Sequence, residues 1–181
     1  MIVLGIDPGS RRCGFGVVER VGSRLVARRS GTVEPGARPL AERLGRIFVE
    51  LTAVLRESGA DAVSVETAFC GASARSALVL GQARGVALAA AAAAGLPVFE
   101  YAPSEVKRAF TGSGQADKAQ MVRTARALLG VEAGLPDEAD ALAAAVCHLA
   151  RRGPAVALVR RRQAQAAALL RPSVRRYGAG R

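Results

Sequence analysis

Four carboxylates occupy positions from which they could act together on a phosphodiester. Asp7 ends one buried apolar run of the sequence, and Glu66 ends another. Asp137 and Asp140 are three residues apart in the first turn of a helix that begins at Pro136, so they share one face of it. If the two apolar runs are neighbouring strands and the helix begins beside their ends, the four side chains converge on one pocket.

Four carboxylates crowded together repel one another unless cations lie between them. Oxygen ligands with no Cys or His beside them select a hard divalent cation, Mg²⁺ or Mn²⁺. Two such ions about 3.5–4 Å apart can hold a phosphodiester, activate a water molecule and stabilise the leaving 3′ oxygen. The sequence therefore predicts two Mg²⁺ ions per site, with Mn²⁺ as the alternative, and phosphodiester hydrolysis.

Each carboxylate taken alone also has a structural explanation. Asp137 and Asp140 follow a proline at a helix N-terminus, where the helix dipole favours acids. Asp7 begins an Asp-Pro-Gly segment that is typical of a turn, and Glu66 could leave its strand into solvent. The single histidine, His148, lies two helical turns beyond Asp140, which favours a helix-face residue over a catalyst. Only the combination of the four acids indicates a catalytic site.

The elements that must position these acids follow from the apolar periodicity. Short turns connect the first three expected strands, which indicates an antiparallel meander. Gly59 and Gly95 are expected to end the first two helices, and Ser104 to cap the third. The expected strands are 2–6, 14–20, 25–33, 62–66 and 98–101, and the expected helices are 39–58, 74–94, a short one at 104, 117–129 and 136–151. This order predicts an α/β domain with a mixed sheet over residues 1–152.

The charge is distributed unevenly along the chain. The 181 residues hold 26 Lys+Arg and 15 Asp+Glu, a formal net charge of +11, which favours a polyanionic partner. Residues 1–150 contain all 15 acids and 17 of the basic residues, a net charge of +2, whereas 151–181 contain nine arginines and no acid. Residues 153–181 are therefore interpreted as a basic C-terminal tail, partly helical or disordered. It is either an added DNA-binding arm or a solvated terminus.

Composition excludes several classes of protein. Half of the residues are apolar, so the chain is not disordered throughout. The sequence does not open on a secretion signal, and its nearly uncharged stretch 85–99 is too short and too weakly hydrophobic to span a bilayer. Three cysteines at no metal-binding spacing suit a reducing compartment. We expect a cytoplasmic protein with no membrane partner.

Several sequence blocks occur in an order and spacing that a known family shares. The chain has Gly-Ile-Asp-Pro-Gly at residues 5–9, Gly-Gln-Ala-Arg-Gly at 81–85 and Asp-Glu-Ala-Asp at 137–140. The opening motif is moderately specific, and the combination of the other two is highly specific. From residue 1 to about 150 the chain resembles the RuvC family of bacterial Holliday junction resolvases.

The resemblance implies a ribonuclease-H-like fold, a five-stranded mixed sheet flanked by helices, in which the four acids are the catalytic Mg²⁺ ligands. It implies a homodimer that nicks two strands of a four-way DNA junction symmetrically and leaves 5′-phosphates, in homologous recombination and DNA repair. The RuvA–RuvB branch-migration complex is the implied protein partner. We expect the dimer interface on the Ala-rich helix 74–94, because small side chains allow close approach.

The resemblance also assigns DNA-binding residues. Lys107 and Lys118 match lysines that the family places near the scissile phosphate, and all other basic residues of this chain are arginines. Phe69 matches an aromatic that the family uses against unpaired or distorted bases at the crossover. The structural alternatives are two solvated lysines and a core phenylalanine. Further phosphate contacts are expected from Arg11, Arg75 and Arg84.

The chain departs from the family pattern at a few positions, and two other functions remain as alternatives. Cys13 stands where the family usually has Thr, Val79 where Lys is common, and the expected Asn is missing near residues 72–73. These changes affect base readout rather than the chemistry. A ribonuclease-H-like RNA nuclease of the YqgF type shares the opening motif but lacks Gly-Gln-Ala-Arg-Gly. A junction-binding protein without catalysis is the other alternative, which the presence of all four acids disfavours.

Overall fold

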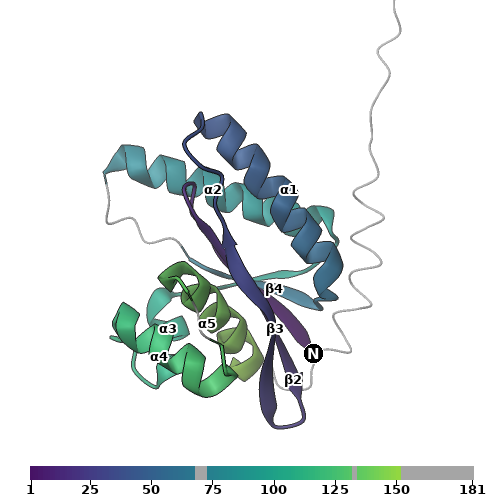
Figure 1. The fold of residues 1–181 in the computed structure, drawn as a ribbon, viewed down its shortest axis with the longest axis vertical. Helices are drawn as coiled ribbons and strands as arrows, with labels where there is room; N and C mark the ends of the chain where they lie inside the picture. The colour runs from purple at the N-terminus through teal and green to yellow at the C-terminus, as the bar shows by residue number, and fades with distance from the viewer. Residues whose placement is uncertain (68–72, 132–133, 152–181) are drawn as a thin grey trace, which may run out of the picture.

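The structure, a computed structural model, describes residues 1–67, 73–131 and 134–151 (Figure 1). The strands are β1 Ile2–Asp7, β2 Cys13–Val21, β3 Arg24–Val33, β4 Ala62–Glu66 and β5 Val98–Tyr101. The helices are α1 Leu40–Ser58, α2 Ala74–Ala93, α3 Pro103–Thr111, α4 Lys118–Leu129 and α5 Pro136–Arg151. The predicted basic tail, 153–181, lies outside the described residues, so its structure stays a prediction.

The five strands form one mixed sheet in the order β3-β2-β1-β4-β5. β1–β2 and β2–β3 are antiparallel, as the short connections predict, whereas β1–β4 and β4–β5 are parallel. α1 makes the crossover between β1 and β4, since parallel neighbours need a long connection. Ile6 pairs with Val65, so β1 and β4 end side by side, and the predicted adjacency of Asp7 and Glu66 along the sheet is confirmed.

Helices cover both faces of the sheet (Figure 1). α1 and α2 lie on one face, where Leu4 and Ile6 of β1 pack against Ile47 and Leu51 of α1. α3, α4 and α5 lie on the other face, in a second cluster of buried side chains that includes Val3 of β1. Because side chains alternate between the faces of a strand, Val3, Gly5 and Asp7 all face α5.

One expectation about the helices is corrected by the structure. Ser104 does not cap α3: the helix begins at Pro103, and the Ala102 N–H donates to Glu105 Oε2 at 2.9 Å. Proline has no backbone N–H that needs an acceptor. The Glu105 carboxylate in the first turn therefore accepts a hydrogen bond from Ala102, the residue before the helix.

α2 covers the Ala-rich stretch that the sequence predicts as a helix over 74–94. Among the described residues α2 is long and apolar enough to cross a membrane by length and composition alone, with a hydropathy of 1.4. One face of α2, with Ala87 and Ala90, is buried in the core cluster shared with α1. Arg84, in the middle of the helix, forms an ion pair with Glu100 of β5 at 2.5 Å. These contacts make α2 part of the layer that covers the sheet.

Candidate active site

Asp7 and Glu66 lie at the ends of adjacent parallel strands and face the same helix. Glu66 is two residues after Ser64 on β4, so both project to one face of the sheet. The Ser64 hydroxyl donates to the Ala144 carbonyl of α5 at 2.7 Å, which identifies that face as the one that α5 covers. Asp7 faces α5 as well, so the two carboxylates share one side of the sheet edge.

Glycines in β1 and β2 let the backbone of α5 touch the sheet. A Cβ built on Gly5 would lie 1.9 Å from the Ala141 carbonyl oxygen, and one on Gly14 would lie 2.0 Å from that of Asp137. Gly14 is the register partner of Asp7 across β1–β2. The start of α5, with Asp137 and Asp140, is therefore held directly against the strand that ends in Asp7. All four predicted acids come together at this edge.

The charges of the acids act on one another. The pKa of Asp7 is raised to about 7, first by burial and then by the negative charges of Asp140, Glu66 and Asp137. Burial, followed by the charge of Asp140, raises the pKa of Glu66 to about 7. The pKa of Asp140 is also raised, mainly by burial. A carboxyl with a pKa of about 7 is partly protonated at neutral pH. Such raised pKa values are expected where several carboxyls are crowded together and partly buried.

Both predicted lysines lie within electrostatic reach of this site. Lys118 begins α4 and lowers the pKa of Asp7 and of Asp140, which opposes the effect of burial. Lys107 on α3 does the same for Glu66 and Asp140. The structure thus brings both lysines within electrostatic range of the acids, although Lys118 is exposed. Their contact with the scissile phosphate stays a prediction.

A hard divalent cation fits this set of donors. Within the described residues no group of three or more His, Cys, Asp or Glu side chains gathers closely enough to hold an ion by itself. Mg²⁺ is normally bound through one or two carboxylates and keeps several waters, so it does not need such a closed cage. A cation would also relieve the repulsion that raises the pKa values of Asp7 and Glu66.

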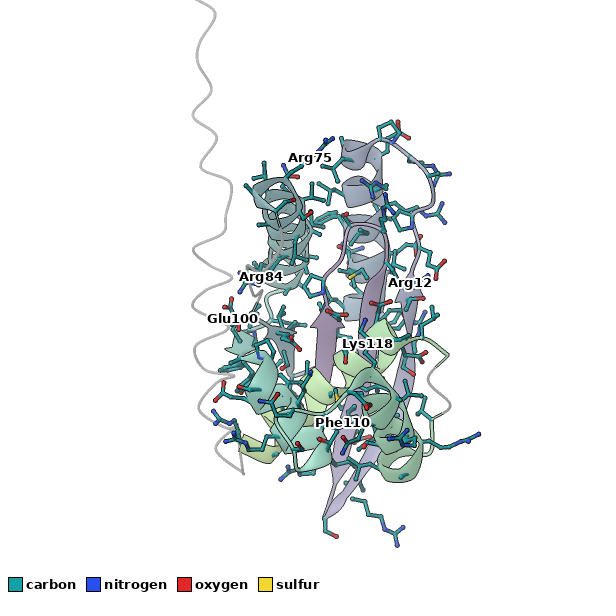
Figure 2. The ribbon with its side chains drawn as sticks, turned by 90° about the vertical axis from the view of Figure 1, so that its left-hand side faces the viewer. Arg12, Arg75, Arg84, Glu100, Phe110 and Lys118 are labelled. Atoms are coloured by element: carbon teal, nitrogen blue, oxygen red, sulfur yellow. The ribbon has the colours of Figure 1, made fainter. Side chains whose placement is uncertain are left out.

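The predicted DNA-contacting residues fall into three groups. Arg11 and Arg75 line a cleft that also contains Asp137. Arg84 instead pairs with Glu100, and in Figure 2 this pair lies on the other side of the view from Arg12. Its contact with phosphate stays a prediction. Phe69 lies outside the described residues.

Sequence reasoning missed Arg12, which bridges two acids near the site. Its Nε donates to Glu34 Oε1 at 2.9 Å, and its Nη1 donates to Asp137 Oδ2 at 3.3 Å. These two acids raise the pKa of the Arg12 guanidinium. No signal in the sequence separates Arg12 from the other arginines, because Glu34 and Asp137 are distant from it along the chain.

His148, which the sequence interpretation gave as a helix-face residue of α5 and not a catalyst, is buried in the core. Its Nδ1 shares a hydrogen bond of 2.8 Å with the Tyr101 hydroxyl, and its ring lies 4.4 Å from that of Phe99. Tyr101 is the register partner of Glu66, and its carbonyl accepts from the Thr67 N–H at 2.8 Å. The buried His148–Tyr101 contact therefore ties α5 to the end of the sheet that carries Glu66.

An acidic site at the edge of a mixed five-stranded sheet, with lysines beside it, is typical of nucleases with the ribonuclease-H-like fold. A family model described as crossover junction endodeoxyribonuclease RuvC matches residues 3–148. The RuvC of Anaeromyxobacter dehalogenans strain 2CP-C is 69% identical over 86% of this chain and 84% of its own length. The chain belongs to the RuvC family of crossover junction endodeoxyribonucleases.

Solved structures agree with this assignment. The Thermus thermophilus RuvC in complex with Holliday junction substrate is 36% identical, with a TM-score of 0.77 over 83% of this chain and 94% of the other. The yeast mitochondrial Holliday junction resolvase Ydc2 is 12% identical, with a TM-score of 0.60 over 93% and 86% of the two chains, which shows a shared fold. The predicted ribonuclease-H-like fold is confirmed.

Proposed function

We propose that this protein resolves four-way DNA junctions by metal-dependent hydrolysis, with Asp7, Glu66, Asp137 and Asp140 as the ligands of two Mg²⁺ ions. The observation that carries the proposal is the convergence of these acids at one sheet edge, where two of them have a pKa of about 7. Buried carboxylates that repel one another destabilise the fold, and groups with such raised pKa values cluster at functional sites. Family membership and the likeness to a RuvC bound to junction DNA supply the substrate.

The residues divide the chemistry between them. Bound divalent ions would supply charge stabilisation and an activated water for hydrolysis. The four carboxylates would hold the ions, and their own positions are fixed because α5 is seated directly on Gly5 and Gly14. Lys107 and Lys118 add compact positive charges beside the same edge, where they stabilise the negative charge of a phosphate. Hydrolysis of this kind breaks the 3′ oxygen–phosphorus bond and leaves a 5′-phosphate.

The protein acts in this proposal as a homodimer, because two symmetric nicks require two sites. The exposed face of α2 supports the placement of the interface. Gly81 and Gly85 are exposed, and a Cβ at either would meet nothing within 4 Å of the same chain. The fold of one chain does not need glycine there, whereas the close approach of a second helix would. Leu78 on the same helix is 66% exposed.

The dimer is tested by placing charge on this face. Gly85→Arg should convert the dimer to a monomer in analytical ultracentrifugation, with little loss of monomer stability. Gly45→Arg, at an exposed α1 glycine that also has open space around it, is the control and should remain dimeric. A dimer that survives Gly85→Arg would remove α2 as the interface. The RuvA–RuvB complex as partner and the cytoplasm as location are proposed from family membership.

Cleavage with different metals tests the catalytic proposal. A synthetic four-way junction should be nicked with Mg²⁺ or Mn²⁺ and left intact in EDTA. Asp7→Asn and Glu66→Gln should each abolish cleavage but retain junction binding. DNA ligase should reseal the nicks, because it requires a 5′-phosphate and a 3′-hydroxyl. Products that ligase cannot seal would contradict the proposed chemistry, and preferential cleavage of RNA would favour the YqgF-type alternative.

A further inference from the structure

A cleft lined by arginines opens beside Asp137. Its volume is about 700 Å³, and its charged lining residues are Arg11, Arg12, Arg43 and Arg75, with Asp137 as the acid. A second hollow of about 560 Å³ shares Arg11 and Arg43 with the first and adds Arg38 and Glu34. Five arginines and two acids thus line the two adjoining hollows, with a net charge of +3.

The walls of the cleft are fixed by hydrogen bonds to the backbone. Arg43 Nη1 donates to the Ser10 carbonyl at 3.1 Å, which ties α1 to the loop between β1 and β2. Arg38 Nη1 donates to the Pro35 carbonyl at 2.9 Å. Arg11, Arg12 and Arg75 are exposed, so their guanidinium groups are accessible to a ligand. A preformed concave surface with several guanidinium groups suits phosphate, whose oxygens accept paired N–H donors.

Arg12 belongs to the cleft and to the catalytic edge at once. It donates to Glu34 on one side and to Asp137 Oδ2 on the other. A guanidinium and a metal ion at this carboxylate compete for its negative charge and repel each other, since both are cations. A phosphate that enters the cleft competes for the same guanidinium. Any ligand that draws Arg12 away from Asp137 therefore frees a carboxylate for the metal.

We propose that this cleft is a second phosphate site, which holds a DNA backbone phosphate away from the scissile one, and that Arg12 is shared between that phosphate and Asp137. The proposal rests on the proposed function, because it takes Asp137 as a metal ligand. Its consequence is a positive coupling: DNA in the cleft favours metal at Asp137, and metal favours DNA. Arg12 acts here as a positioning residue.

The first test measures Mn²⁺ affinity of the full chain without DNA, by electron paramagnetic resonance of free Mn²⁺. Arg12→Gln should bind Mn²⁺ about two- to fivefold more tightly, the range expected for removing an exposed competing ion pair. Arg12→Lys keeps the positive charge but cannot donate to both acids at once. Its Mn²⁺ affinity should lie between those of the unsubstituted protein and Arg12→Gln. Arg11→Gln is the control, since it removes the same charge from the adjacent position. An equal gain in Arg11→Gln would overturn the shared role of Arg12.

The second test measures junction binding in EDTA as a function of salt concentration. Arg38→Gln and Arg12→Gln should each lower the slope of log K against log salt by about one, because each removes one phosphate contact. Arg46→Gln is the matched control: Arg46 lies on α1, is exposed and pairs with Glu50. Slopes equal to that of Arg46→Gln would overturn the phosphate site. Neither test measures cleavage. A protein that does not cleave junctions would refute the proposed function, whereas the Mn²⁺ affinity and the salt slope would still decide whether the cleft binds phosphate.

Discussion

Substitution of Gly5 by alanine tests whether direct contact between α5 and the sheet positions the acids. The added methyl group would lie 1.9 Å from the Ala141 carbonyl oxygen and 2.7 Å from the Ala145 nitrogen. A carbon–oxygen contact needs about 3.3 Å, so α5 must move by roughly 1.4 Å. Both contacts are backbone atoms, and no side-chain rotation relieves them. Because α5 carries Asp137 and Asp140, the displacement separates these acids from Asp7.

Two magnitudes follow for Gly5→Ala. Overpacking of this kind costs about 1–3 kcal/mol of unfolding free energy. A misplacement of about 1 Å costs on the order of 100-fold in rate. Denaturant unfolding and the rate of junction cleavage measure the two effects.

The control for Gly5→Ala is Gly45→Ala. Gly45 lies in α1 with nothing within 4 Å of its Cβ position, so alanine there should stabilise the protein by about 0.5–1 kcal/mol and leave cleavage unchanged. Gly14→Ala, which meets the Asp137 carbonyl oxygen at 2.0 Å, should resemble Gly5→Ala. Normal stability and normal cleavage in Gly5→Ala would refute the reasoning.

Three further predictions concern pH, the core and the tail. Asp7 and Glu66 keep protons in the folded protein up to a pKa of about 7, above the unfolded values of 3.8 and 4.5. The folded state therefore binds more protons than the unfolded state in this pH range. In EDTA the free energy of unfolding should fall as pH rises from about 4 to 7. Asp7→Asn should make this decrease smaller, because it removes one of the two titrating groups. Thermal unfolding across pH checks the sign, and a rise would contradict it. Tyr101→Phe should cost about 1 kcal/mol in denaturant unfolding, because it removes the buried hydrogen bond to His148; an unchanged midpoint would show that the bond contributes nothing. Truncation after Gly153 should leave metal-dependent cleavage intact and flatten the salt dependence of DNA binding, and an unchanged slope would reject the tail as a DNA-binding arm.

Most of the architecture could be predicted from the sequence because the local signals agree with the fold. The apolar runs that end in Asp7 and Glu66 form β1 and β4, and Gly59 and Gly95 follow α1 and α2 with positive φ angles of 61° and 71°. Ser104 shows the limit of such reasoning. A serine near a helix start is a good cap, but with Pro103 and Glu105 beside it the N-cap is Ala102, two positions earlier than Ser104.

The four acids could be predicted as a set, whereas the contacts that hold them could not. Alternation along a strand gives the face of Asp7, but it does not say that α5 rests on Gly5 with backbone contact. The bridge from Arg12 to Glu34 and Asp137 joins segments far apart in the chain, and 3.3 Å contacts of this kind follow only from the packed structure. The pairing of Arg84 with Glu100 is of the same type.

We propose that the four acids make this protein a junction-selective, metal-dependent nuclease. Cleavage of a synthetic four-way junction, compared with a linear duplex of the same sequence in Mg²⁺, tests it most directly. We expect paired nicks at symmetric positions on two strands of the junction, with the duplex left intact and no cleavage by Asp7→Asn. Equal cutting of the duplex, or nicks that persist in Asp7→Asn, would contradict it.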